Sequence, residues 1–314
     1  MASTSAAGSS IAAPRRPAQV KPRELADPLN HYLFHPLANR LAVMLRPTGI
    51  SPNTVSLISG MVVMAATLAY LGLERPFSVL LGFALHLSWH VLDGADGELA
   101  RLTGKATPFG ELVDGVADYA GHVFLYLLLA WSLEPWLGLW AYWLVAASGV
   151  SRIAQSNHAE TQRRMYLWRV YGVPWLKQAQ ASEDALFEPK GPIAKISAAI
   201  ARLYIRLASA TNPHSAEIDE AFARAAGDEA ETERLRRICR SSSRGSLLYL
   251  RLLGANPRTI LLGLSMALGS PLWFFLVEIS LLNVVLALSI AHQRRSNRAV
   301  AVRLGPAPDP AGGG

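Results

Sequence analysis

The sequence predicts an all-α integral membrane protein with six transmembrane helices, and three observations support this fold class. Hydrophobic residues make up 51% of the 314 residues and charged residues only 17%, whereas soluble domains carry about 25% charged residues. The apolar residues are also clustered, in stretches that approach the ~20 residues that a helix needs to cross a bilayer. Finally, basic residues alternate between neighbouring loops.

Six apolar stretches have the required length, at about residues 52–73, 77–101, 108–133, 135–155, 247–268 and 271–292. The last two are separated by Gly269, Ser270 and Pro271. A single helix through this break, over 258–292, would be roughly 50 Å long, which is too long for one crossing. We therefore predict two spans here.

The charges of the loops support this topology. Bases are frequent before the first stretch, between the fourth and fifth, and after the sixth, and Arg101 and Lys105 lie between the second and third. The remaining loops carry a single base, Arg75, or none. This alternation follows the positive-inside rule for six spans with both termini in the cytoplasm. It predicts a multi-pass protein of the cytoplasmic (inner) membrane whose active site is cytoplasmic.

The net charge of +7 has the same explanation, because bases gather on cytoplasmic loops and near anionic lipid headgroups. No RNA- or DNA-binding motif is visible, so we expect the lipid bilayer, and no nucleic acid, as a partner. The single cysteine, Cys239, excludes a disulfide framework and a cysteine-based zinc site.

The domain organisation follows from the composition along the chain. Residues 1–26 are rich in Ala, Ser, Pro and Arg and are predicted to be disordered, and 305–314 are a flexible tail. Between them, 27–304 form the membrane domain. It opens with a predicted interfacial helix over 27–47, in which four apolar residues can share a face: Leu37, Leu41, Met44 and Leu45. The alternative is an ordinary amphipathic helix packed on protein.

The segment 156–245 is predicted to be a helical cytoplasmic insertion between the fourth and fifth spans, with helices near 190–210 and 215–240. The first of these helices has an apolar stripe at spacings of three and four, formed by Ile193, Ile196, Ile200, Leu203 and Leu207. Such a stripe fits a helix packed on the bundle and a helix lying on lipid equally well.

Four aspartates stand at two adjoining span ends. Asp93 and Asp96 are three residues apart near the end of the second span, and Asp114 and Asp118 are four apart near the start of the third. Each pair shares one helix face, and a short turn would bring all four carboxylates together. Carboxylates inside spans are costly and usually functional. Their repulsion calls for cations, and an all-oxygen site suits Mg²⁺, Mn²⁺ or Ca²⁺ rather than zinc.

Small residues accompany these carboxylates. Gly97 and Ala100 follow Asp93 on the same helix face, and Gly110 precedes Asp114 by four residues. They favour either close packing of helices or open room for a flat nucleotide, and both interpretations stay open. Arg101 returns to the same face, where its fork of donors would suit phosphate oxygens. Its alternative role is that of an ordinary cytoplasmic-loop arginine.

Together, the residues from Asp93 to Asp118 fill the pattern DxxDGxxARx₈GxxxDxxxD. This pattern resembles the signature of the CDP-alcohol phosphotransferase (CDP-alcohol phosphatidyltransferase) family. Eight fixed positions at average residue usage make a chance match about one in 10⁷. The segment Ser51-Pro52-Asn53-Thr54 is similar to the family's Pro-Asn element near the nucleotide.

The resemblance implies roles for the matching residues. Asp93, Asp96 and Asp114 would bind two divalent ions, Mg²⁺ or Mn²⁺, and Asp118 would be the general base and a further metal contact. Nucleotide contacts would come from the remaining matching positions, which are Asn53, Gly97, Ala100, Arg101 and Gly110. The resemblance also implies a homodimer. His122, which lies near the motif, is interpreted as a structural polar residue.

The predicted function is transfer of a phosphatidyl group from CDP-diacylglycerol to the hydroxyl of a small polar alcohol, with release of CMP by a single displacement. Candidate acceptors include inositol or its phosphate, glycerol 3-phosphate and serine. An anionic acceptor would need bases, which Arg152, His158, Arg163 and Arg164 could supply. Positive-inside charge alone would explain the same four residues.

Three alternatives stay open at the level of function. The first is transfer of a CDP-linked headgroup to a lipid alcohol such as diacylglycerol or ceramide. The second is a cation transporter, since intramembrane acidic residues also mark ion pathways, and a transporter would release no CMP. The third is a structural scaffold, for which Asp118→Asn would retain full biological activity.

Overall fold

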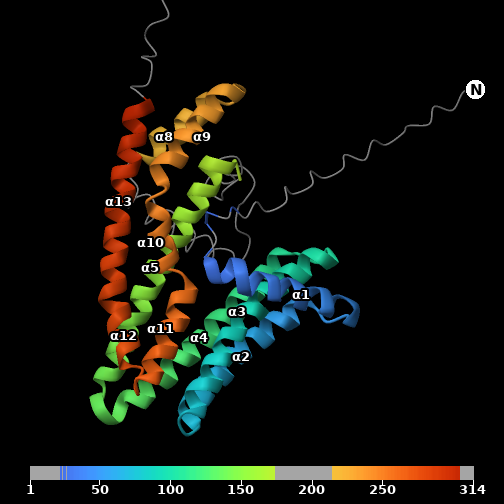
Figure 1. Ribbon diagram of the computed structural model, residues 1–314, viewed down its shortest axis with the longest axis vertical. Coiled ribbons are helices and arrows are strands. Elements are labelled where there is room, and N and C mark those ends of the chain that lie inside the picture. Colours follow the sequence, from blue (N-terminus) through green and yellow to red (C-terminus); the bar gives the residue numbers. More distant parts are fainter. Residues whose placement is uncertain (1–21, 23, 26, 174–213, 305–314) are drawn as a thin grey trace, which may run out of the picture.

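The computed structural model describes residues 22, 24, 25, 27–173 and 214–304, and every regular element within these ranges is a helix (Figure 1). The predicted all-α class is confirmed. Within the described ranges, four helical segments are long and apolar enough to cross a membrane, at Pro52–Gly72, Phe77–Thr103, Phe109–Leu137 and Leu272–Leu304. The count of six spans stays a prediction. The disorder predicted for 1–21, the helix predicted near 190–210 and the flexible tail predicted at 305–314 lie outside the described ranges.

The first long helices begin and end where the local sequence dictates. Helix α2 (Pro52–Gly72) is capped by Ser51, whose Oγ accepts from the Thr54 amide at 3.1 Å, and α4 (Pro108–Leu137) is capped in the same way by Thr107. Helix α3 (Phe77–Thr103) ends at Gly104, which has a φ of 67°. A three-residue connection then leads from Lys105 to α4, so the ends of α3 and α4 that carry the aspartates are close in the chain.

The segment before α2 forms a π-helical turn, η1 (Asn30–Phe34), helix α1 (His35–Leu45) and a 3₁₀ turn, η2 (Arg46–Thr48). Helix α1 lies across the ends of α2 and α3 (Figure 1). Its buried face is made of the small residues Ala38 and Ala42, whereas Leu37 and Met44 are exposed. An outward apolar face suits an interfacial helix, and that placement stays a prediction.

The fourth predicted span, 135–155, is wrong at both ends. Helix α4 continues to Leu137, and α5 (Trp140–Tyr171) begins after it and extends sixteen residues beyond residue 155. Residues 156–171 are therefore a continuation of α5 and not part of a separate insertion. The polar half of α5 stays helical because it is packed against other helices; Gln155 and Gln162, for example, are buried.

The fifth and sixth predicted spans are each divided into two helices. Residues 247–268 form α10 (Ser246–Leu252) and α11 (Ala255–Ala267), which are separated at Gly254. Residues 271–292 fall in α12 (Leu272–Ile279) and α13 (Leu281–Leu304), which are separated by one irregular residue. The predicted turn between these two spans, at Gly269–Pro271, is present.

The predicted helix at 215–240 is also two helices, α8 (Ser215–Arg224) and α9 (Glu229–Ser243). Gly227, with a φ of 99°, and the N-cap Asp228 account for the break. Both helices pack on the outer ends of α5 and α13 (Figure 1). The cluster that they share consists of Tyr166, Val170, Ile218, Cys239, Leu247 and Val300.

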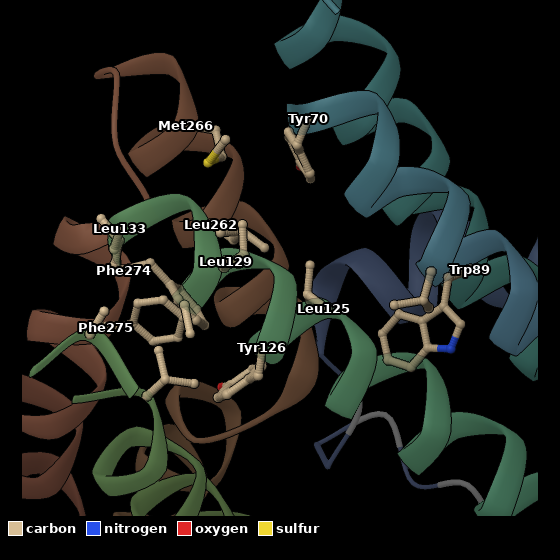
Figure 2. Packing of buried hydrophobic residues seen from close by; sticks show 14 residues of the cluster. Tyr70, Trp89, Leu125, Tyr126, Leu129, Leu133, Leu262, Met266, Phe274 and Phe275 are labelled. Carbon is tan, nitrogen blue, oxygen red and sulfur yellow. The ribbon is translucent and has the colours of Figure 1, made fainter. Parts of the chain in front are cut away.

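The main core joins α2, α3, α4, α5, α11 and α12 around aromatic and aliphatic side chains (Figure 2). Helix α2 packs on both α3 and α4. Its approach to α4 depends on glycine, because a Cβ on Gly60 would lie 2.6 Å from the Ala117 carbonyl oxygen, and one on Gly121 would lie 2.9 Å from the Gly60 oxygen. Such small-residue contacts are typical of helix pairs in membranes.

We expect Gly60→Ala to destabilise the protein by about 1–3 kcal/mol, because the methyl group forces α2 away from α4. The matched control is Gly149→Ala in α5, where an added Cβ meets nothing within 4 Å and better helix propensity adds up to about 1 kcal/mol. Thermal unfolding in detergent measures both. A Gly60→Ala midpoint at or above that of Gly149→Ala would contradict the close packing.

Candidate active site

The structure brings the four aspartates of α3 and α4 into one group. The Asp93 carboxyl lies within electrostatic range of those of Asp96, Asp114 and Asp118. The carboxyl groups of Asp96 and Asp114 are close enough for a hydrogen bond between them. Because α2 packs on both helices, it fixes the distance across which these side chains meet.

Neighbouring side chains hold two of the carboxylates in place. Asp96 is 4% exposed and its Oδ2 accepts from Ser56 Oγ of α2 at 2.5 Å, while its Oδ1 accepts from the Gly97 amide. Asp118 Oδ1 accepts from Trp89 Nε1 at 2.7 Å. The sequence analysis missed both Ser56 and Trp89. Helical spacing could have found them, since Trp89 precedes Asp93 by four residues and Ser56 follows Asn53 by three.

His122 packs beside Asp118 in the way that a structural residue would. Its Nδ1 lies 2.9 Å from the Asp118 carbonyl oxygen and 3.7 Å from Oδ1. The ring also contacts Trp89 edge to face, with 4.7 Å between centroids. His122 therefore supports the Trp89 indole, which in turn orients the Asp118 carboxylate.

Among the described residues, Lys and Arg side chains do not pair with the four aspartates. In the described part of the chain, no Lys or Arg nitrogen lies within 4 Å of the carboxylates of Asp93, Asp96, Asp114 or Asp118. No set of three or more His, Cys, Asp or Glu side chains among the described residues already has metal-ligand spacing. The donors are all carboxylate oxygens, however, so their chemistry fits hard divalent cations such as Mg²⁺ or Mn²⁺.

The two glycines among the proposed nucleotide residues differ in the space around them. A Cβ on Gly97 would meet only the Arg101 guanidinium, at 3.5 Å, so no helix packs there. This observation favours open room over close packing as the reason for the glycine. A Cβ on Gly110 would lie 3.3 Å from Asn53 Oδ1, which places Asn53 next to the start of α4.

Ala100 is half-buried on α3, and Arg101 one residue later is exposed. The Arg101 guanidinium forms an ion pair with Glu98 at 2.5 Å. Exposed pairs of this kind contribute about 0–1 kcal/mol. Arg101 can therefore exchange Glu98 for a phosphate at little cost.

A cavity of about 770 Å³ adjoins the acidic group and is bounded by η1, α1, α3, α5, α10 and α11. Asp93 and Trp89 line one wall, and Glu160, Arg163 and Arg164 line the wall formed by α5. Both arginines pair with Glu160, at 2.8 Å and 2.5 Å. The cavity is thus lined by an aspartate of the acidic group on α3 and by two bases on α5.

The four predicted acceptor bases do not form one group. Arg163 and Arg164 line the cavity, whereas Arg152 and His158 are not among its lining residues. His158 Nε2 lies 2.9 Å from Ser289 Oγ of α13, and Arg152 Nη1 donates to Tyr126 at 3.3 Å. Arg251, which the sequence analysis did not consider, also lines the cavity and donates to the Glu24 carbonyl oxygen at 2.7 Å.

Apolar helices that enclose a cluster of carboxylates mark a functional site of an integral membrane protein, and an all-oxygen donor set is of the kind that metal-dependent enzymes use. Comparison with known families identifies the family. The family model for CDP-alcohol phosphatidyltransferase matches residues 49–209, which is more than half of the chain, and the protein belongs to this family. No curated protein and no solved structure matches the chain.

Membership makes the protein a phosphotransferase for substituted phosphate groups. The matched range contains all four aspartates, together with Asn53, Gly97, Ala100, Arg101 and Gly110. It ends before α8, so the helices α11 and α12 that complete the main core lie outside it.

Proposed function

We propose that the protein transfers a phosphatidyl group from CDP-diacylglycerol to the hydroxyl of a small polar alcohol and releases CMP. The observation that carries this proposal is the meeting of Asp93, Asp96, Asp114 and Asp118, inside the family match, beside a cavity that could hold the alcohol. The proposed setting is a six-span homodimer in the inner membrane, with α5 and the consecutive helices α10 and α11 as the two further spans and with the termini and site facing the cytoplasm.

In this proposal Asp118 accepts the proton of the acceptor hydroxyl. Trp89 holds Oδ1 of the carboxylate at 2.7 Å, which leaves Oδ2 free to take the proton. The alkoxide oxygen attacks the phosphorus distal to cytidine, and the bond between that phosphorus and the oxygen bridging to CMP breaks. The electron pair of the broken bond stays on CMP, so no covalent intermediate with the protein is needed.

The four aspartates would hold Mg²⁺ or Mn²⁺, and two bound ions would offset the negative charge of the pyrophosphate. The hydrogen bond from Ser56 restricts the orientation of the Asp96 carboxylate and would support it as a ligand. Arg101 would contact a phosphate oxygen in place of Glu98, and the open surface at Gly97 would accept the nucleotide.

The bases of the cavity favour an acceptor with a negative charge. Arg163 and Arg164 lie about half exposed on the wall of the cavity that Asp93 also lines, and they share a single carboxylate, Glu160. Two guanidinium groups with one counterion retain donors for a phosphate. Among the candidate alcohols, inositol phosphate and glycerol 3-phosphate therefore fit better than inositol or serine.

The test is incubation of purified protein with Mg²⁺ or Mn²⁺, CDP-diacylglycerol and a panel of these alcohols, followed by CMP assay and lipid mass spectrometry. We expect CMP release that depends on both metal and alcohol, and a new phospholipid with the phosphorylated acceptors. CMP release only with a CDP-linked headgroup and diacylglycerol or ceramide would reverse the direction of transfer. No CMP from any combination would contradict the proposal and favour the transporter.

A further inference from the structure

A second group of charged residues lies buried in the bundle, centred on two residues outside the family match. Arg258 of α11 and Glu278 of α12 form an ion pair at 3.1 Å, with side-chain exposures of 3% and 0%. Both residues lie outside the matched range 49–209. Buried charges among apolar helices are costly and usually serve a function.

The pair is held by hydrogen bonds from several helices. Glu278 Oε2 accepts from Tyr126 of α4 at 2.5 Å and from Ser148 of α5. Arg258 Nη2 donates to Gln155 Oε1 at 2.7 Å, and Gln155 Nε2 donates to the Glu278 carbonyl oxygen at 3.0 Å. The remaining Arg258 nitrogen, Nη1, donates to two carbonyl oxygens at the break between α10 and α11. The pair is thus a fixed point where α4, α5, α11 and α12 meet.

Tyr126 connects this fixed point to Arg152. Its hydroxyl donates to Glu278, so its oxygen is free to accept from Arg152 Nη1 at 3.3 Å, and the guanidinium lies 5.5 Å from the ring centroid. The ring is held edge to face by Phe274 and Phe275, at 6.1 Å and 5.4 Å (Figure 2). Tyr126 therefore has little freedom to move, and it restricts where Arg152 can lie.

Arg152 contacts α4 on the side of that helix that carries Asp118. Tyr126 follows Asp118 by eight residues and His122 by four, so the three side chains lie on one side of α4 within about two turns. The Arg152 guanidinium bound to Tyr126 also attracts the Asp118 carboxylate. Within the described residues, the contact with Tyr126 is the one hydrogen bond found for Arg152. A guanidinium has five N–H donors, so most of them are available to a substrate oxygen beside Asp118.

We propose that Glu278 and Arg258 are positioning residues for the transfer reaction: through Tyr126 they hold Arg152 on the side of α4 that carries Asp118, where its free donors orient an anionic oxygen of the acceptor as the acceptor hydroxyl reaches Asp118. This inference rests on the proposed function. A pair that merely joined helices would affect stability, donor binding and acceptor binding together. A positioning pair affects the acceptor selectively.

The first test is Tyr126→Phe, which keeps the ring between Phe274 and Phe275 but removes both hydrogen bonds. We expect kcat/KM for the acceptor to fall about tenfold, as for loss of a hydrogen bond to a charged group, with the KM for CDP-diacylglycerol unchanged and the thermal midpoint lowered by no more than about 4 °C. The matched control is Tyr142→Phe, which removes a hydroxyl that donates to Glu134 at 2.8 Å, a hydrogen bond that involves none of the residues of this network. Wild-type kinetics are expected there.

The second test combines Tyr126→Phe with Arg152→Lys. Because both changes disturb the same contact, the double variant should lose little more acceptor kcat/KM than the worse single variant. Multiplying losses, or an equal fall in donor and acceptor parameters with a lowered thermal midpoint, would overturn the inference. So would an active wild type that Tyr126→Phe leaves unchanged. A wild type without metal-dependent CMP release would overturn the proposed function, and this inference with it.

Discussion

Asp118→Asn is expected to lower the rate of CMP release about 10³-fold, the middle of the range for loss of a general base. Asparagine has nearly the same shape as aspartate, and its amide oxygen can still accept from Trp89 Nε1. The site should therefore keep its geometry while it loses the group that takes the acceptor proton. The measurement is single-turnover CMP release at saturating donor and acceptor.

The matched control for this change is Glu111→Gln, which removes a carboxylate one turn before Asp114 on the same helix. Glu111 is exposed in the first turn of α4, so we expect a rate within about threefold of wild type, as for surface changes in general. If Asp118→Asn behaved like this control, Asp118 would not be the base. The scaffold interpretation would then gain support.

Asp96→Asn is expected to lower activity more than about 100-fold, beyond the 10–100-fold range typical of residues that only support a metal ligand. Asp96 is the most buried of the four aspartates, with 4% of its surface exposed. An amide in its place is a weaker ligand for Mg²⁺. The half-saturating Mg²⁺ concentration should rise as well. Titration of CMP release with Mg²⁺ measures both effects.

Ser56→Ala is expected to change the Mg²⁺ requirement less than Asp96→Asn does. It leaves the Asp96 carboxylate in place and removes only the hydroxyl that donates to it at 2.5 Å. We expect a rise of about tenfold in half-saturating Mg²⁺, as for a supporting residue. An unchanged Mg²⁺ requirement in Asp96→Asn, with reduced activity, would mean that Asp96 acts without binding metal.

The helices were predictable from the sequence wherever apolar residues continue for a full span, as in α2 and α3. The prediction failed where tertiary packing replaces hydropathy. The polar half of α5 is helical because residues such as Gln155 and Arg169 are buried against other helices, which a hydropathy pattern does not register. The break between α12 and α13 at Ser280 carries no Gly or Pro to mark it.

In the candidate site, too, the local features were predictable from the sequence and the tertiary contacts were not. The aspartate spacing is local, so the sequence indicated which residues would share a helix face. The contacts of Asp96 with Ser56 and of Asp118 with Trp89 join residues 40 and 29 positions apart and depend on how the helices pack.

The four proposed acceptor bases are close in sequence but do not share one site. Arg152, His158, Arg163 and Arg164 lie on one helix, but each residue turns about 100° from the last. They consequently face different neighbours: Tyr126, Ser289 and, for the last two, the cavity. The Arg258–Glu278 pair was not anticipated, because nothing in either local sequence indicates the other.

The central claim is that carboxylates of α3 and α4 together hold divalent cations, and Mn²⁺ binding followed by electron paramagnetic resonance tests it most directly. We predict about two bound Mn²⁺ per chain in the wild-type protein, retained in Glu111→Gln and lost when Asp93 and Asp114 are both replaced by Asn. Mn²⁺ binding by the doubly substituted protein at the wild-type level and affinity would contradict the account.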